Sequence, residues 1–369
     1  MTAHDRATGI LTVDLDAIAA NWRLLAALAP GAEAAGVVKA DSYGLGAPQV
    51  AKTLLAAGCK TFFVATIDEG ISLRPHVGKA RIFVLGGVLP GTGADFTEHD
   101  LIPVLNSPDQ VGLWAGFAHA QSKSLPAALH LDTGMSRLGL DTKAVHLLAT
   151  DKRHLDGIDV ALVMSHMACA DEPGHDKNPE QLAAFQAMTA DLMIPAPRSL
   201  AASSTIFLGS DFHFDLTRPG AALYGLNPVP GQPNPLHPVV RLNGRILQVR
   251  DVDTPQTVGY GATHRFASKG RVATVAFGYA DGLFRSLGNC GFGVIGGVKV
   301  PVVGRISMDL TTFDVSAVPA DAVHPGAMIE LIGPDHDADQ LADEAGTIGY
   351  EVLTALGRRY LRDYVGGHV

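Results

Sequence analysis

The sequence predicts an α/β protein in which a TIM-type (β/α)8 barrel precedes a mostly-β C-terminal domain. Over the first 225 residues, short apolar and β-branched runs alternate eight times with Ala- and Leu-rich amphipathic segments. Such alternation over this length is typical of a parallel barrel rather than an open sheet. Beyond residue 238, short strand-like runs follow one another between Gly, Asp and Pro, which indicates a β-rich domain.

The expected barrel strands are short, and most are followed by a loop rich in polar residues and glycine. They are Val37–Ala40, Phe62–Ala65, Arg81–Leu85, Ile102–Leu105, Ala127–Asp132, Val160–His166, Ser199–Ser203 and Leu216–Arg218. The helices expected between them open with Asp, Ser or Pro, which are residues that commonly begin helices. Examples are Asp16–Leu28, Pro48–Ala57, Ser107–Phe117 and Pro179–Leu192.

A proline-rich segment separates the two expected domains. Residues 227–238 carry five prolines and few backbone donors, which is typical of a linker. We therefore expect a barrel domain over residues 1–235, whose first ~12 residues can pair with the second domain, and a C-terminal domain over residues 236–369. The strands expected there are Val239–Val249, Val272–Phe277, Phe292–Ile295, Lys299–Val303, Thr311–Val315 and Met328–Ile332, with a closing helix around Tyr350–Tyr360.

Composition argues against several classes of function. Apolar residues make up 47% of the chain and charged residues 18%, which suffices for a large folded core. The net charge of −9 gives no support to nucleic-acid or anionic-membrane partners. Three cysteines at unrelated spacings fit a reducing compartment, and the sequence contains no signal-peptide pattern and no membrane-length apolar run. We expect a cytoplasmic globular protein without a metal site.

Lys39 is the first candidate for chemistry, because it closes an apolar strand. An unpaired buried ammonium costs several kcal/mol in desolvation, so burial favours the neutral, nucleophilic amine. Catalytic groups of parallel barrels also lie at the C-terminal ends of the strands. On this pattern alone, a lysine whose ammonium reaches the surface from a strand end is an equally good interpretation.

Polar residues also follow the last four expected strands. The segments are Asp132–Gly139, Met164–Asp171, Leu200–Ser204 and Leu216–Ala221. The ends of strands seven and eight are where such barrels commonly hold a phosphate group, on hydroxyl and glycine N–H donors. A reactive lysine near a phosphate site suggests pyridoxal phosphate as the cofactor.

These segments belong to a longer series of motifs. In chain order the series is Val38–Gly44, Asp132–Gly139, Ser165–His166, Arg218–Gly220, Leu223–Gly225, Gly259–Ala262, Gly278–Gly282, Val303–Asp309 and Thr347–Tyr350. With it the chain resembles the alanine racemases, the fold type III group of pyridoxal-phosphate enzymes, over nearly its whole length. The resemblance implies a homodimer with shared active sites that interconverts L-alanine and D-alanine and supplies D-alanine for peptidoglycan.

The resemblance also implies a pair of acid/base groups. Lys39 would hold the cofactor covalently and serve one face of the substrate, and Tyr260 of the partner subunit would serve the other. Racemisation requires two such groups, because the proton leaves one face and returns on the opposite one. A free tyrosine has a pKa near ~10, so Tyr260 needs assistance, and His166, next in a chain to Arg218, is the candidate.

The remaining matched residues are expected around the cofactor and the substrate. Arg218 would bind the pyridine nitrogen; a guanidinium only donates, so that nitrogen stays unprotonated, which favours racemisation over transamination. Arg137 would contact the cofactor and, with the Met308 backbone, the substrate carboxylate. The phosphate would be bound by Tyr43, Ser203, Gly220, Ala221 and Tyr350, and the entrance would be lined by Asp171, Tyr279, Arg285 and Arg305.

Two positions depart from the family pattern. A lysine that is often carbamylated and orients the catalytic arginine would fall at position 130, where this chain has His130. The usual asparagine before the phosphate-binding serine is Ala202 here. These departures keep a serine racemase or a broad-specificity racemase open as the alternative. A pyridoxal-phosphate-binding protein without turnover is a further alternative, against which Tyr260 argues, and a decarboxylase is disfavoured by Arg218.

Overall fold

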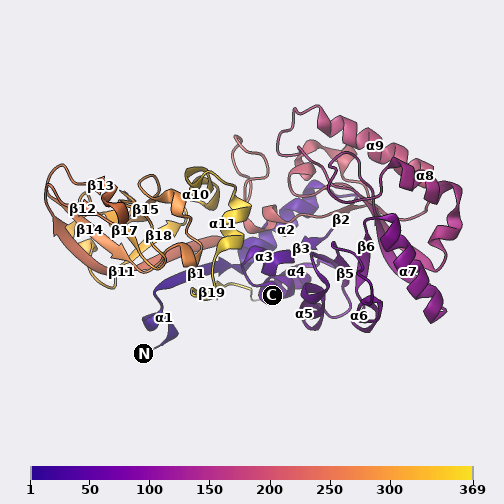
Figure 1. The fold of residues 1–369 in the computed structure, drawn as a ribbon, viewed down its shortest axis with the longest axis horizontal. Helices are drawn as coiled ribbons and strands as arrows, with labels where there is room; N and C mark the ends of the chain where they lie inside the picture. Colours follow the sequence, from indigo (N-terminus) through magenta and orange to yellow (C-terminus); the bar gives the residue numbers. More distant parts are fainter. Residues whose placement is uncertain (1, 368–369) are drawn as a thin grey trace.

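Two domains lie beside each other, a barrel of strands and helices and a mostly-β domain (Figure 1). The computed structural model describes residues 2–367. Seven parallel strands of the barrel form one sheet in the order β3–β4–β5–β6–β7–β8–β9. They are β3 Gly36–Val37, β4 Thr61–Val64, β5 Arg81–Val84, β6 Ile102–Leu105, β7 Leu125–His130, β8 Ile158–Met164 and β9 Arg198–Ser199.

Strand β10 (Leu216–Thr217) closes the barrel. It pairs in parallel with β2 (Glu33–Ala34), which precedes β3 by a single residue. On the other side, the Arg218 amide donates to the Ala201 carbonyl over 2.8 Å, just beyond the end of β9. Because β2 and β3 together act as one strand, the ring contains eight strands. The predicted fold class, a TIM-type barrel followed by a mostly-β domain, is confirmed.

Helices cover the outside of the barrel (Figure 1). Several begin at a side chain that accepts a hydrogen bond from the first turn, as Asp14 does from the Ala17 amide and Ser107 from the Gln110 amide. The helices are α2 Leu15–Leu28, α4 Ala47–Ala57, α5 Ile67–Val77, α6 Gly93–Glu98, α7 Pro108–Gln121, α8 Thr142–Thr150 and α9 Lys177–Leu192. Fully buried aromatic side chains, including Phe62, Phe63, Phe83 and Trp114, contribute to the hydrophobic core.

The second domain is built on an eight-stranded sheet that includes strands from both ends of the described chain. Strand β1 (Gly9–Asp14) pairs antiparallel with β11 (Val240–Val252) and parallel with β19 (Leu361–Val365). The sheet is completed by β14 Gly270–Val275, β15 Phe292–Ile295, β16 Val298–Pro301, β17 Thr311–Asp314 and β18 Met328–Ile332, and a separate pair consists of β12 Thr257–Val258 and β13 His264–Arg265.

Short helices complete the fold. The α-helices are α1 Ala3–Arg6, α3 Lys39–Tyr43, α10 Ala338–Ala345 and α11 Gly349–Ala355. The 3-10 helices are η1 Lys152–Leu155, η2 Ser204–Leu208, η3 Ser210–Phe212, η4 Ala221–Tyr224, η5 Tyr260–Ala262, η6 Tyr279–Asp281, η7 Arg285–Leu287 and η8 Ala320–Ala322. Within residues 2–367, no helix combines the length and the apolar character needed to cross a membrane.

The structure differs from the sequence-based expectation in several elements; the strand expected over Ser199–Ser203, for example, ends at Ser199. The strand expected over Val37–Ala40 ends at Val37, and Lys39 begins the short helix α3. The closing helix expected around Tyr350–Tyr360 ends at Ala355. The following residues form β19, because the exposed edge of β1 offers them backbone partners that lie more than 340 positions away in the sequence. Local periodicity contains no information about such a distant partner.

Asn21 fastens the interdomain linker to the barrel. It is completely buried on α2, and its amide nitrogen donates to the carbonyls of Leu223 and His237, over 3.3 and 2.9 Å. Its side-chain oxygen accepts from the His237 amide over 2.8 Å. A single side chain thereby satisfies three buried or partly buried backbone groups at the point where the chain leaves the barrel.

Replacing Asn21 with leucine, which has a similar volume, should lower the free energy of unfolding by about 2–3 kcal/mol. The reason is that the backbone groups of Leu223 and His237 lose their partners while they stay buried. The midpoint of urea unfolding measures the effect. Gln49→Leu, on the exposed side of α4, serves as the control, and equal midpoints for the two variants would contradict this role of Asn21.

Candidate active site

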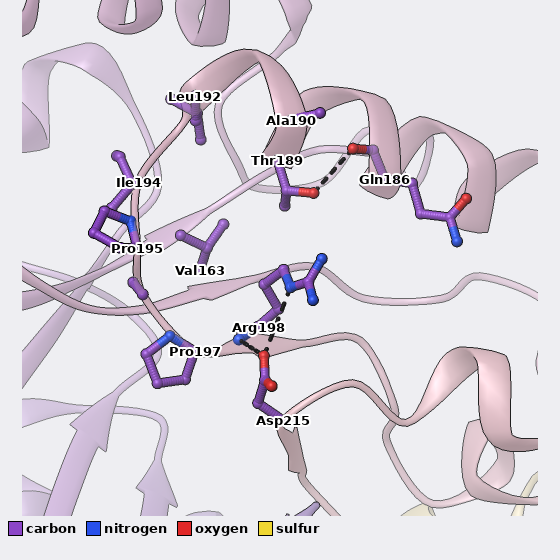
Figure 2. A pocket seen from close by; sticks show the side chains of 11 residues that line it. Val163, Gln186, Thr189, Ala190, Leu192, Ile194, Pro195, Pro197, Arg198 and Asp215 are labelled. Atoms are coloured by element: carbon purple, nitrogen blue, oxygen red, sulfur yellow. Dashed lines mark hydrogen bonds and ion pairs between the residues drawn. The ribbon is translucent and has the colours of Figure 1, made fainter.

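The candidate site lies at the C-terminal ends of the barrel strands, where the segments named from the sequence follow β3, β7, β8, β9 and β10. A cavity of about 530 Å³ lies elsewhere. Figure 2 shows it between the end of α9 and an ion pair of Arg198 with Asp215. These two residues stand at the N-terminal ends of β9 and β10. The cavity is therefore at the opposite end of the strands from the candidate site.

Lys39 is held by an unusual backbone turn. The four residues that follow it, Ala40 to Tyr43, all have positive φ angles between 52° and 56°. This conformation costs roughly 1 kcal/mol for each residue other than glycine. Two hydrogen bonds offset the cost: the Ala40 amide donates to Glu69 Oε1 on α5 over 2.7 Å, and the Ala47 amide donates to Asp41 Oδ1 over 2.7 Å.

The surroundings of Lys39 favour its neutral amine. Burial lowers the pKa of Lys39, and the nearby Arg137 guanidinium lowers it further, whereas the Glu69 carboxylate acts in the opposite direction. Lys39 is half-buried, so the distinction drawn from the sequence, between a buried amine and one that reaches the surface, stays a prediction. The lowered pKa of Lys39 favours the neutral amine, which is the nucleophilic form.

Arg218 is buried inside the barrel, with only 4% of its surface exposed. Its Nη1 donates to Ser199 Oγ over 2.5 Å and its Nη2 donates to the Ser165 carbonyl over 2.6 Å. No carboxylate in the described part of the chain forms an ion pair with it. Burial lowers the pKa of Arg218 to about 9, which still leaves the guanidinium charged at neutral pH. A buried cation with neutral partners fits an electron-rich acceptor on a bound molecule.

His166 follows β8, and the charge of Arg218 affects its pKa. Burial, followed by the Arg218, Arg137 and Lys39 cations, lowers the pKa of His166 to about 3, so the imidazole is neutral near pH 7. Gln181, which is completely buried on α9, fixes the backbone there. Its amide nitrogen donates to the His166 carbonyl over 3.0 Å.

Arg137 lies on the loop that follows β7, and its side chain is exposed. Asp132 Oδ1 shapes the start of this loop by accepting the amides of residues 134, 135 and 136, over 2.9–3.1 Å. Within residues 2–367, Arg137 forms no hydrogen bond or ion pair. It is nevertheless close enough to Lys39, His130 and His166 to influence the pKa of each.

Hydroxyl and amide groups gather beside the turn that carries Lys39. Ser203 Oγ accepts from the Gly220 and Ala222 amides, over 3.0 and 3.1 Å. A Cβ atom on Gly220 would lie 2.6 Å from the hydroxyl oxygen of Tyr43, so any larger residue there would have to displace the Tyr43 side chain. The Tyr43 ring also packs 6.1 Å from the Tyr350 ring, between centroids. Ala221 opens η4 at the same place, although the amide bonded to Ser203 belongs to Ala222.

Asp171 lies near this group as well. Burial raises the pKa of Tyr350, and the negative charge of Asp171 raises it further. The residues predicted from the sequence to bind a phosphate thus occupy one neighbourhood, together with one of the predicted entrance residues.

The other predicted residues form a second group on the C-terminal domain. Tyr260 lies between β12 and β13, at the end of this domain away from the barrel (Figure 1), and 72% of its surface is exposed. Arg305 is its neighbour: a Cβ on Gly261 would lie 3.2 Å from Arg305 Nη1. The backbone of Arg285 lies near that of Arg305, around Gly288.

Tyr279 and Met308 are joined through their turns. The Tyr279 amide donates to the Ser307 carbonyl over 3.1 Å, and the next amide, that of Ala280, donates to the Met308 carbonyl over 3.0 Å. Both side chains are exposed, at 44% for Tyr279 and 53% for Met308. One chain therefore presents two separate sets of candidate residues, one in the barrel and one on an exposed part of the C-terminal domain.

Three residues near the site were not singled out from the sequence. Glu69 and Gln181 act through hydrogen bonds to backbone groups from other parts of the barrel, and no local pattern reveals such bonds. Asn106 directly follows β6 and bonds to His130. Its position one residue beyond a barrel strand was the available signal, because functional residues gather at such ends.

Two family models match successive parts of the chain. The model of the alanine racemase N-terminal domain matches residues 13–228, and that of the C-terminal domain matches residues 239–364. The chain belongs to the alanine racemase family. The resemblance stated from short motifs is thereby confirmed over both domains. The barrel-side set of candidate residues lies in the first match except for Tyr350, which lies in the second match together with the exposed set.

Individual relatives in the alanine racemase family align over nearly their full length. An alanine racemase of Rhodospirillum rubrum is 54% identical over 99% of this chain and 98% of its own. A catabolic and a biosynthetic alanine racemase of Agrobacterium fabrum are 47% and 46% identical, over 97% and 98% of this chain and 92% and 95% of their own. Sequence identity therefore does not distinguish a catabolic from a biosynthetic role.

Solved structures of the alanine racemase family agree with this fold. The crystal structure of alanine racemase from Bartonella henselae, with covalently bound pyridoxal phosphate, has a TM-score of 0.94 and 39% identity. It covers 97% of this chain and 100% of that chain. The alanine racemase of Streptomyces coelicolor has a TM-score of 0.93 and 33% identity, with 99% and 100% coverage.

Changing Glu69 to glutamine should lower the pKa of Lys39 further, because the carboxylate charge that favours the ammonium is removed. The pH dependence of Lys39 acetylation by acetic anhydride, followed by peptide mass spectrometry on cofactor-free protein, measures this pKa. We expect the midpoint to move to lower pH, and Glu98→Gln, exposed on α6, should leave it in place. A midpoint that stays constant or rises in Glu69→Gln would contradict this electrostatic description.

Proposed function

We propose that this chain is an alanine racemase that uses pyridoxal 5'-phosphate to interconvert L-alanine and D-alanine. The observation that carries the proposal is the gathering of Lys39, Arg218 and a set of hydroxyl and amide donors at one end of the barrel. Family membership supports the same reaction.

The donor set fits the cofactor chemically. Lys39 would hold it covalently through an amine that burial makes more nucleophilic. Arg218, buried without an anionic partner, would donate to the ring nitrogen. The phosphate would be bound by Tyr43, Ser203, Gly220, Ala221 and Tyr350, where Gly220 leaves room for close approach. When bound, pyridoxal phosphate withdraws electrons from the amino acid and makes its Cα–H bond acidic.

Two residues would move the proton. The Lys39 amine takes or returns it on one face of the substrate, and Tyr260 of the partner subunit does so on the opposite face. His166 would support this tyrosine as a neutral hydrogen-bond acceptor, because its lowered pKa excludes the imidazolium at neutral pH. Arg137 and the Met308 backbone amide would bind the substrate carboxylate.

We further propose that the enzyme is a homodimer with shared sites. Tyr260, Tyr279 and Met308 are exposed on the domain that lacks Lys39, and two copies arranged symmetrically would bring each set against the other chain's barrel. Arg285, Arg305 and Asp171 would line the entrance. The proposal extends to a barrel domain over residues 1–235, a C-terminal domain over 236–369, and a cytoplasmic role in supplying D-alanine for peptidoglycan.

Chiral analysis of L-alanine and L-serine, incubated with the holoenzyme, tests the function. D-alanine should form rapidly and reversibly, Lys39→Ala should abolish it, and Tyr260→Phe should slow both directions at least ~100-fold while the cofactor stays bound. Comparable rates on serine would establish the broad-specificity alternative associated with His130 and Ala202. Wild-type rates in Tyr260→Phe would contradict the two-group mechanism, and absence of inversion would contradict the function.

Mixing the two inactive variants tests shared sites. A hybrid dimer of Lys39→Ala and Tyr260→Phe chains would contain one site with both defects and one site with none. After subunit exchange at equal amounts, roughly a quarter of the wild-type activity should return, because half of the dimers are hybrids with one intact site. Exchange is verified by mass spectrometry of differently tagged chains, and hybrids without activity would contradict sharing.

A further inference from the structure

His130 and Asn106 form a buried pair at the base of the candidate site. His130 is the last residue of β7 and Asn106 directly follows β6; their exposed fractions are 9% and 4%. His130 Nδ1 lies 2.8 Å from Asn106 Oδ1. In the family pattern, a lysine that orients the catalytic arginine falls at position 130, where this chain has His130. The reaction described above assigns no role to Asn106.

The hydrogen bonds of Asn106 determine which ring nitrogen of His130 carries the proton. Asn106 Nδ2 lies 2.8 Å from the Val104 carbonyl and 3.0 Å from the Leu85 carbonyl. Carbonyl oxygens only accept, so the amide nitrogen must face them and Oδ1 must face His130. Because Oδ1 also only accepts, His130 Nδ1 is the donor. Its Nε2 then has a lone pair and no proton, provided that the ring is neutral.

The charges around His130 keep the ring neutral. Burial lowers the pKa of His130 to about 4, and the Arg218 and Arg137 guanidinium groups contribute in the same direction, whereas Asp132 opposes them. His166, the other titratable group close by, is itself neutral near pH 7. At neutral pH, Nε2 of His130 is therefore an acceptor near two cations.

Of these two cations, Arg137 is the one whose guanidinium has no partner among the described residues. Arg218 already donates to Ser199 and Ser165. Arg137 has no hydrogen-bond or ion-pair partner in residues 2–367, and a free arginine side chain loses up to ~2 kcal/mol of rotamer entropy when it is ordered. A fixed acceptor would reduce the number of conformations that remain to be lost when a substrate binds.

The same two residues also anchor the loop that carries Arg137. The Gly139 amide donates to the Asn106 carbonyl over 3.2 Å, and the Leu140 amide donates to the His130 carbonyl over 2.7 Å. The end of the loop and the imidazole are therefore fixed to one structural unit. The distance between the Arg137 backbone and the His130 ring is consequently set by the barrel itself.

We propose that Asn106 and His130 are positioning residues for Arg137: Asn106 holds the imidazole as the Nδ1–H tautomer, and Nε2 accepts a hydrogen bond from the Arg137 guanidinium when a carboxylate is bound. The inference rests on the proposed function, in which Arg137 binds the substrate carboxylate. In this arrangement the neutral His130 ring orients the Arg137 guanidinium without neutralising its charge.

The test measures binding of propionate, a carboxylate without an amino group, to the holoenzyme by titration calorimetry. His130→Phe removes the acceptor and should weaken propionate binding at least tenfold, whereas His130→Gln, which offers an amide oxygen, should stay within threefold of the wild type. For alanine turnover, His130→Phe should raise KM more than it lowers kcat. His119→Phe, exposed on α7, is the control and should bind propionate as the wild type does.

A double-mutant cycle separates positioning from a structural effect. In a background of Arg137→Ala, His130→Phe should have less than a twofold further effect, because its consequence passes through the missing arginine. Asn106→Asp, nearly isosteric, would pair with a protonated imidazole, convert Nε2 into a donor, and weaken propionate binding about tenfold; this variant tests the proposal if His130→Phe fails to fold.

Additive effects in the cycle, equal weakening by His130→Phe and His130→Gln, or wild-type binding in Asn106→Asp would each overturn the proposal. The proposed function and the positioning role can fail separately. If the wild type racemises alanine and the His130→Phe variant binds propionate as well as the wild type does, the positioning role is overturned and the proposed function stands. A wild-type protein that neither racemises alanine nor binds propionate would overturn both.

Discussion

The buried charge of Arg218 is the constraint on which the rest of the site depends. A guanidinium inside a barrel, with only neutral oxygen acceptors at Ser199 and Ser165, imposes a positive potential on every group around it. Burial lowers the pKa of His166 and of His130, and this potential lowers both further, so the two rings are neutral near pH 7. The potential also makes the region receptive to electron-rich atoms of a bound molecule, because a cation taken out of water without an anion lacks full compensation. The chemistry of the site thus follows from one uncompensated charge.

The barrel places this charge and the reactive amine on one continuous piece of sheet. Arg218 follows β10 and Lys39 follows β3, and the bonds that close the ring join these strands through Ala35 and Val37. The left-handed turn after Lys39 ends at Tyr43, whose hydroxyl belongs to the cluster of hydroxyl groups. Ring closure is therefore a condition for the site as well as for stability, because an open sheet would separate the two groups.

Much of this arrangement could be predicted from the sequence, and the reasons are physical. Barrel strands are short apolar runs whose ends lie together whatever their partners are, so Lys39, Arg137, His166 and Arg218 could be assigned to one end before any contact was known. The turn at Ala40 could not be predicted, because it is held by Glu69 from another helix. Strand β19 was missed for the same reason, because its partner β1 is distant in the sequence. Asn106 could have been named from its position one residue beyond β6. The exposure of Tyr260 likewise becomes visible only when the domain is folded.

The pairing of β1 with β11 and β19 has a consequence for the order of synthesis. During translation β1 emerges ahead of the whole barrel, whereas both of its partners emerge after it. The barrel strands, including the closing pair of β10 and β2, all precede β11 and β19 in the chain, so the barrel can close while β1 still presents two open edges. The second domain therefore completes its sheet last, around a strand that precedes the barrel, and until then the unpaired edges of β1 are available for pairing with other chains.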